Sequence, residues 1–126
     1  MRLIAVVTAM SIVTLAAGPS RAQDAAAGEA VFKKCQPCHI ANEDKNKIGP
    51  SLMGVIGRTA GTHPNFSYSK AMVEAGQGGL VWDEANLTTY LHNPKAMVKG
   101  TKMAFAGLQK DEDITNVIAY LKQFSK

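Results

Sequence analysis

The chain has 126 residues, of which 46% are hydrophobic and 19% charged, and this is the size and composition of one small globular domain. Its formal net charge is +4, from 14 lysine and arginine residues against 10 aspartate and glutamate residues. This excess is too weak for a nucleic-acid-binding protein, and no basic tract with interleaved aromatic residues supports that function.

Residues 1–22 are predicted to be a cleaved secretory signal peptide. Arg2 gives a positive start, an apolar run without a charge extends from residue 3 to residue 17, and residues 20–22 (Ser-Arg-Ala) offer small side chains where a signal peptidase reads them. The alternative is an uncleaved anchor, but the apolar run is shorter than the ~20 residues that cross a bilayer. We therefore expect export to the periplasm, without stable membrane insertion.

The mature domain is then predicted to be residues 23–126. Without the two arginines of the signal peptide it holds twelve basic and ten acidic residues, a net charge of about +2. A helix is expected from Asp24, its N-cap, to Lys34. Gly28 costs such a helix about 1 kcal/mol relative to alanine, which indicates a close crossing with another helix.

Directly after this helix comes the motif Cys35-Gln36-Pro37-Cys38-His39. A Cys-x-x-Cys-His motif is the attachment signature of a c-type haem. Two thiols separated by two residues can each add to one vinyl group of the same macrocycle, and the next residue supplies an imidazole as an axial iron ligand. The sequence therefore predicts one covalent haem c, attached through Cys35 and Cys38, with His39 on the iron.

Two other kinds of site use paired cysteines. A zinc site would need a second pair of cysteine or histidine ligands, and the chain has no third cysteine. A thiol oxidoreductase would place the pair in a βαβ context, and nothing in the chain indicates alternating strands.

Loops are predicted for residues 40–79, because Gly, Pro, Asn and Ser are frequent there and apolar residues are scattered. A structureless segment of that length is unusual in a compact domain, but a haem can serve as the apolar core around which loops fold. A second helix is expected after Trp82, capped by Asp83 and ended by Asn93. Pro94 then begins one short helical turn.

The last helix has the clearest pattern. Asp111 is expected to cap it, and its apolar stripe consists of Ile114, Val117, Ile118 and Leu121. No segment of the chain has the pattern of a strand, so the predicted fold class is all-α.

The second iron ligand decides what a haem can do. The candidates in the mature chain are Met53, Met72, Met97, Met103, His63 and His92. Met103 stands apart because it lies far beyond the haem motif, in a glycine-containing loop between two helices. A histidine and a methionine together raise the reduction potential and leave no iron position for a substrate, which is the chemistry of electron transfer.

A longer set of landmarks extends over nearly the whole mature chain. They are Gly28, Phe32, Cys35 to His39, Gly49-Pro50, Arg58, Phe66-Ser67-Tyr68, Trp82, Tyr90-Leu91, Asn93-Pro94, Gly100-Thr101-Lys102-Met103 and Phe105-Ala106-Gly107. In these residues and their spacing the chain resembles class I cytochrome c, of the mitochondrial and bacterial cytochrome c2 type. The resemblance implies short helices and long loops wrapped around one haem, with Gly28 and Phe32 facing the last helix near Val117 and Tyr120.

The resemblance also implies the residues of the site. His39 and Met103 would be the axial ligands, and the carbonyl group of Pro50 would accept the proton of the other imidazole nitrogen. The remaining haem contacts that it implies are Arg58, Tyr68 and Trp82 at the propionates, Tyr90 and Thr101 near the methionine sulfur and the inner propionate, and Phe105.

The function that follows is a small soluble periplasmic carrier of single electrons, not an enzyme. The alternative is a haem enzyme or gas binder, such as a peroxidase, with an open or weakly held sixth iron position. The resemblance implies a cytochrome bc1-type quinol-oxidising complex as donor and a terminal oxidase or photosynthetic reaction centre as acceptor. We expect a monomer that meets acidic patches of these partners through lysines around the haem edge: Lys34, Lys47, Lys95, Lys99, Lys102 and Lys110.

Overall fold

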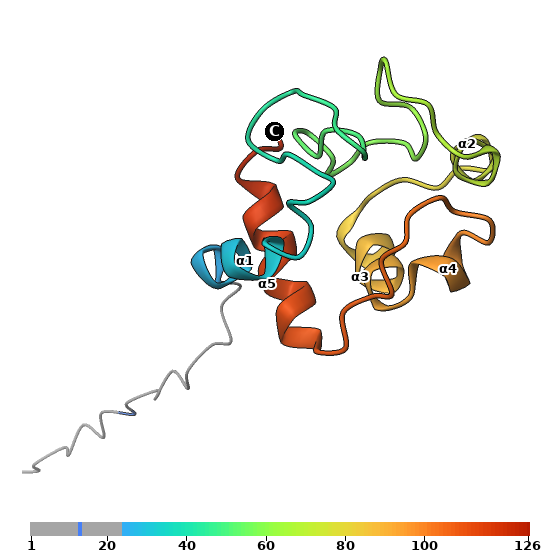
Figure 1. The fold of residues 1–126 in the computed structure, drawn as a ribbon. Helices are drawn as coiled ribbons and strands as arrows, with labels where there is room; N and C mark the ends of the chain where they lie inside the picture. The colour runs from blue at the N-terminus through green and yellow to red at the C-terminus, as the bar shows by residue number, and fades with distance from the viewer. Residues whose placement is uncertain (1–12, 14–23) are drawn as a thin grey trace, which may run out of the picture.

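The computed structural model describes residue 13 and residues 24–126, so the predicted signal peptide lies, apart from residue 13, outside the described residues. The described part contains the helices α1 (Ala25–Phe32), α2 (Lys70–Gln77), α3 (Glu84–His92), α4 (Pro94–Met97) and α5 (Asp111–Lys122) (Figure 1). It contains no strand, only one isolated antiparallel bridge between Thr59 and Val81. The predicted all-α class is confirmed. Within these residues no helix is long and apolar enough to cross a membrane.

The two terminal helices, α1 and α5, pack against each other (Figure 1). A Cβ atom at Gly28 would lie 1.9 Å from the carbonyl oxygen of Asn116 in α5, so a side chain at this position would force the helices apart. Beside the crossing, the ring centroids of Phe32 and Tyr120 lie 5.2 Å apart. The interpretation of Gly28 as the site of a close helix crossing is therefore confirmed.

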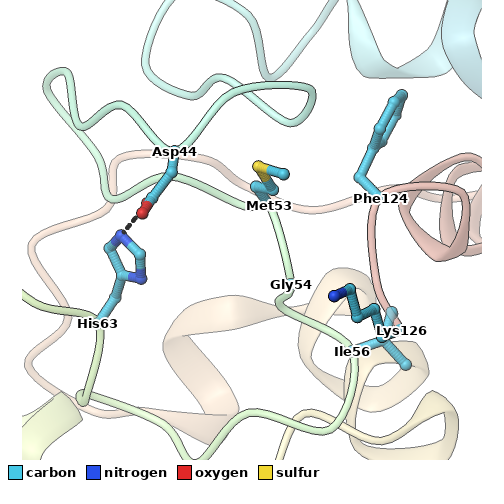
Figure 2. A pocket seen from close by; sticks show the side chains of 7 residues that line it. All are labelled: Asp44, Met53, Gly54, Ile56, His63, Phe124 and Lys126. Atoms are coloured by element: carbon cyan, nitrogen blue, oxygen red, sulfur yellow. Dashed lines mark ion pairs between the residues drawn. The ribbon is translucent and has the colours of Figure 1, made fainter.

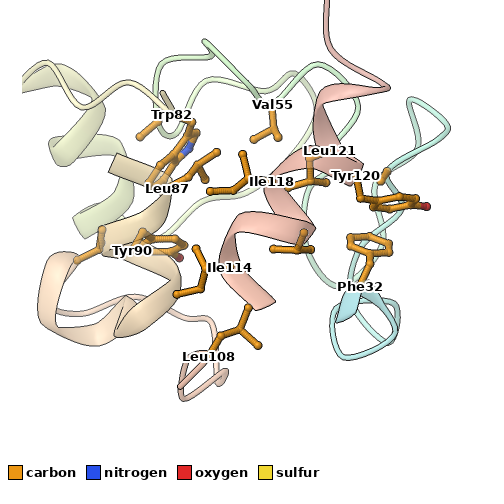
Figure 3. Packing of buried hydrophobic residues seen from close by; sticks show 14 residues of the cluster. Phe32, Val55, Trp82, Leu87, Tyr90, Leu108, Ile114, Ile118, Tyr120 and Leu121 are labelled. Atoms are coloured by element: carbon orange, nitrogen blue, oxygen red, sulfur yellow. The ribbon is translucent and has the colours of Figure 1, made fainter. Parts of the chain in front are cut away.

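Helix α5 forms the centre of the hydrophobic core. Its predicted apolar stripe is buried throughout, and Ile114 is completely enclosed. Across from this stripe, the core is completed by Trp82 and by Leu87 and Tyr90 of α3 (Figure 3). Burial of an aliphatic side chain contributes about 1.5–3 kcal/mol, so the stripe provides a large share of what holds α5 in place.

Side-chain caps define where most of the helices begin. Asp24 and Asp83 accept hydrogen bonds from backbone N–H groups in the first turns of α1 and α3, at 3.0 and 2.7 Å, as predicted. Asn93 ends α3 and caps the short helix α4, in which Pro94 is the first residue. The predicted order of these segments is confirmed.

The prediction that Asp111 caps the last helix is wrong. Lys110 occupies the N-cap position without a side-chain hydrogen bond, and Asp111 is the first helical residue. It is one of three acidic residues in the first turn of α5, where negative charge is stabilised by the positive end of the helix dipole. Its carboxylate also lies 2.9 Å from Nε2 of His92, at the end of α3.

The prediction of loops throughout residues 40–79 is also wrong, because α2 lies within this range. Ser69 caps α2 by accepting a hydrogen bond from a backbone N–H at 3.1 Å. Gly76 in this helix is buried, and a Cβ atom there would lie 1.8 Å from the carbonyl oxygen of Ala60. This glycine therefore serves close packing rather than a turn, and composition alone does not distinguish the two.

We expect Gly28→Ala to lower the free energy of unfolding of the holoprotein by about 1–3 kcal/mol. Overpacking against the Asn116 carbonyl group outweighs the gain of ~1 kcal/mol in helix propensity. Gly78→Ala is the control, because a Cβ atom there would meet its nearest neighbour at 3.4 Å and should change the stability by less than ~1 kcal/mol. Denaturant titrations measure both effects, and equal effects would contradict the role of Gly28.

Candidate haem-binding site

The Cys-x-x-Cys-His motif continues from α1 as one further helical turn. The N–H groups of Cys38 and His39 donate to the carbonyl oxygen of Cys35, at 3.1 and 2.9 Å. The N–H of Cys35 donates in turn to the carbonyl oxygen of Phe32, at 2.7 Å. Residues three apart on such a turn share one face, so both thiols are presented together at the end of α1. Both are half-buried and neither forms a disulfide.

The surroundings of Cys35 differ from those of a reactive thiol. Burial, and after it the neighbouring Cys38, raise the pKa of the Cys35 thiol to about 11. A nucleophilic or redox-active cysteine instead has a lowered pKa in an electropositive environment. Cys35 therefore lacks the electrostatics of the reactive cysteine of a thiol oxidoreductase.

The loop that follows His39 holds its ring in one orientation. The ring nitrogen Nδ1 lies 2.8 Å from the carbonyl oxygen of Pro50, to which it donates. A Cβ atom at Gly49 would lie 2.3 Å from the ring atom Cε1, so glycine allows the backbone to pack against the imidazole. Burial lowers the pKa of His39, and the bond to Pro50 partly opposes that shift. The imidazole is therefore neutral, with Nε2 as the nitrogen that can bind a metal.

Met103 lies between α4 and α5, beside Tyr90 of α3. The Tyr90 hydroxyl group donates to the sulfur of Met103 at 3.9 Å, and the N–H of Met103 donates to Oγ1 of Thr101 at 3.2 Å. Burial raises the pKa of Tyr90, so its hydroxyl group stays a donor at neutral pH. On its other side the ring of Tyr90 packs against Trp82, with centroids 4.6 Å apart. The structure thus brings together four of the residues predicted from the sequence, namely Trp82, Tyr90, Thr101 and Met103.

Arg58 and Tyr68 form a separate polar group. Arg58 donates through Nη1 to the carbonyl oxygen of Ser51 at 2.9 Å, and its pKa is lowered by burial, an effect that Tyr68 opposes. The Tyr68 hydroxyl accepts a hydrogen bond from the N–H of His63 at 3.2 Å, and burial raises its pKa. Half-buried donors of this kind are suited to a partly buried carboxylate, such as a haem propionate.

The other two histidines of the described chain pair with carboxylates. Nε2 of His63 lies 2.8 Å from Asp44, and Nε2 of His92 lies 2.9 Å from Asp111. Within residues 24–126, no hydrogen bond or ion pair connects His39 and Pro50 with the group formed by Tyr90, Thr101 and Met103.

The other candidate methionines occupy packing or surface positions. Met72 and Met97 are partly buried against the core, as is Phe105. Met53 is 42% exposed. Met53 lines a pocket of about 390 Å³ that contains none of the predicted haem residues (Figure 2). The residues that line this pocket are Asp44, Met53, Gly54, Ile56, His63, Phe124 and Lys126.

Two residues near His39 are absent from the sequence-based site. Ser51 is completely buried although it is polar, and Asn46 donates through its side chain to the carbonyl oxygen of Pro64 at 3.1 Å. The side chain of Asn46 also accepts a hydrogen bond from the N–H of Ser51, and the Ser51 hydroxyl group bonds the backbone of Glu43 and Met53. A single serine or asparagine in a loop rich in such residues carries no signal that would single it out.

Comparison with known proteins identifies the family of this chain. The family model for cytochrome c matches residues 25–125. The chain belongs to the cytochrome c family. With Cys35 and Cys38 in the attachment motif, the cofactor of this cytochrome c is covalently bound haem c, and the protein is an electron-transfer protein.

Relatives of this cytochrome c come from several bacteria. It is 53% identical over 100 residues to cytochrome c2 of Afifella marina, with 79% of this chain and 81% of the relative covered. Among solved structures, cytochrome c2 from Rhodospirillum centenum matches with a TM-score of 0.78 and 44% identity, covering 82% and 99% of the two chains. Cytochrome cH from Methylobacterium extorquens matches with a TM-score of 0.73 and 42% identity, covering 79% and 98%.

We expect Met103→Ala to abolish the sulfur-to-iron absorption band and to lower the reduction potential, because a methionine ligand raises that potential. Met97→Ala is the matched control: it removes a partly buried methionine at a cost of about 2–5 kcal/mol in stability but should leave the band intact. Absorption spectra of the ferric holoproteins measure the band. Loss of the band in Met97→Ala alone would contradict the ligand assignment.

We expect the double variant Cys35→Ala/Cys38→Ala to be largely unfolded. The loops between residues 40 and 69 contain no helix and only scattered apolar residues, so we expect them to need the cofactor for much of their apolar contact. Far-ultraviolet circular dichroism during heating tests this expectation. A cooperative melt like that of the holoprotein would show that the chain folds without haem.

Proposed function

We propose that this cytochrome c is a soluble periplasmic carrier of single electrons, with His39 and Met103 as the axial ligands of its haem iron. The observation that carries the proposal is the hydrogen bond from Nδ1 of His39 to Pro50, which leaves Nε2 for the iron. The contact of the Tyr90 hydroxyl group with the sulfur of Met103 supports the second ligand.

Bound haem supplies a one-electron couple between Fe(II) and Fe(III). The Pro50 carbonyl group fixes the ring of His39 and raises its basicity, while Tyr90 and Thr101 position Met103. With His39 and Met103 both bound to the iron, no position would remain for a substrate. In this proposal Arg58, Tyr68 and Trp82 hydrogen-bond the propionates, and Phe105 packs against the haem.

The enzymatic alternatives have less support. A peroxidase-like enzyme would need acid–base groups beside an open iron position, whereas His63 bonds Asp44, His92 bonds Asp111, and the hydrogen-bond partners of Met103 include neither histidine. A thiol oxidoreductase would need a cysteine with a lowered pKa, and the pKa of Cys35 is raised. We therefore propose that the protein is not an enzyme.

Exposed lysines are the proposed contact with redox partners. In the described part of the chain, Lys70 and Lys122 each pair with a glutamate, whereas no ion pair is formed by Lys34, Lys47, Lys95, Lys99, Lys102 and Lys110. One of them, Lys47, donates through Nζ to the carbonyl oxygen of Gln36, which holds it beside the haem motif. Unpaired charges act over long distances and speed the encounter with acidic patches.

The proposed partners are a cytochrome bc1-type complex as donor and a terminal oxidase or photosynthetic reaction centre as acceptor. Residues 1–22 are the proposed export signal, so residues 23–126 would act in the periplasm as a monomer. The visible spectrum and the oxidation of reduced protein by membrane fractions, followed by stopped flow, test the function. A low-spin spectrum with a sulfur-to-iron band and rapid oxidation are expected, and a high-spin spectrum would contradict the carrier.

We expect Lys34→Glu and Lys95→Glu to slow association with the partner while leaving the absorption spectrum unchanged. The rate for the unmodified protein should also fall with salt, because the Debye length shrinks from about 10 Å at 0.1 M to about 3 Å at 1 M. Lys126→Glu is the control. Lys126 lines the pocket beside Met53 and Phe124, which contains none of the predicted haem residues, so this charge reversal should not affect docking (Figure 2). Stopped-flow rates that do not respond to salt or to either reversal would mean that docking is apolar.

A further inference from the structure

Ser51 is the most deeply buried polar residue of the described chain, with no exposed surface. All of its polar groups are engaged. Its N–H donates to Oδ1 of Asn46 at 2.9 Å, and its carbonyl oxygen accepts from Arg58 at 2.9 Å. Its hydroxyl group donates to the carbonyl oxygen of Glu43 at 2.6 Å and accepts from the N–H of Met53 at 3.2 Å. Four groups of the chain, from Asn46, Arg58, Glu43 and Met53, therefore fix the position of one small residue.

This residue directly follows Pro50, whose carbonyl oxygen accepts the proton of His39. The carbonyl group of Pro50 and the N–H of Ser51 belong to one planar peptide group and point in opposite directions. One edge of this peptide group therefore bonds the imidazole, and the opposite edge bonds Asn46. Because the peptide group is rigid, any rotation that breaks the bond to Asn46 also moves the acceptor away from His39.

We propose that Ser51, anchored by its buried hydroxyl group, is a positioning residue that sets the strength of the hydrogen bond from His39 to Pro50. Through this bond it sets the basicity of the imidazole and hence the reduction potential. The inference rests on the proposed binding of iron by His39.

The bonds form one continuous series. It starts at Nδ1 of His39, crosses the Pro50–Ser51 peptide group to the side chain of Asn46, and ends at the carbonyl oxygen of Pro64. Successive hydrogen bonds polarise one another, so each strengthens its neighbours by roughly 10–30%. The hydroxyl group of Ser51 keeps the series aligned because it ties the same residue to Glu43 and Met53.

The test is Ser51→Ala in the holoprotein. We expect a higher reduction potential, because a weaker bond to Pro50 makes the imidazole less basic and destabilises the ferric state. We also expect the Nδ1 proton of His39, followed by NMR in the reduced protein, to exchange with water about three to ten times faster, as the loss of one hydrogen bond implies. The spectrum should stay low-spin.

Ser125→Ala is the matched control. The Ser125 hydroxyl group also donates to a carbonyl oxygen, that of Leu121 at 3.3 Å, and accepts from an N–H, that of Ile56 at 3.2 Å. It has the same bonding pattern but does not adjoin Pro50. We expect this variant to lose stability without a change in potential or proton exchange. If Ser51→Ala behaves like Ser125→Ala, the positioning role is overturned and Ser51 is only structural.

Two variants of Asn46 test the same peptide group if Ser51→Ala does not accumulate. Asn46→Asp keeps an acceptor for the N–H of Ser51 but loses the donor to Pro64, whereas Asn46→Leu loses both. We expect slow proton exchange at His39 in Asn46→Asp and fast exchange in Asn46→Leu. Equal exchange in the two would overturn the inference. A high-spin spectrum of the unsubstituted protein would instead contradict the iron ligation itself.

Discussion

The crossing of α1 and α5 is the constraint on which the rest of the structure depends. The cysteine motif follows α1 as a further turn, so the position of α1 on α5 also decides where the two thiols lie. Helix α5 packs against α3 as well, and α3 carries the Tyr90 that contacts Met103. Both halves of the candidate haem site are therefore positioned relative to one helix, and the carbonyl of Asn116 can approach α1 only because residue 28 has no side chain.

Hydrogen bonds, rather than regular secondary structure, fix the long segment between α1 and α2. Ser51 and Asn46 tie this segment to itself and to Pro64. Its middle is tied to the end of the chain, because Gly54 donates to the carbonyl oxygen of Phe124. Each such bond contributes only about 0.5–1.5 kcal/mol net, but a buried polar group left without a partner costs more, so the network specifies one conformation.

Much of the candidate site could be proposed from the sequence because its residues carry local chemical signals. The thiols and His39 occur in one short motif, and Asp24 and Asp83 mark helix starts that the structure confirms. The errors arose where local signals compete. Three acidic residues at the start of α5 all favour a helix start, and only the fold shows that Lys110 precedes the first turn. Helix α2 cannot be recognised from composition, because a sequence does not distinguish a glycine needed for close packing, such as Gly76, from a glycine needed for a turn. The surroundings of Ser51 depend on contacts with distant segments, which a single sequence does not reveal.

The pairing of the first and last helices also governs the order of events during biosynthesis. Helix α1 is synthesised well before α5, the helix that packs against it. A helix of eight residues is not stable by itself in water, so α1 is not fixed in place before α5 has been made. Contacts between such distant segments form slowly, because a long loop must first close. We therefore expect the two cysteines that follow α1 to stay accessible for haem attachment until α5 packs against α1.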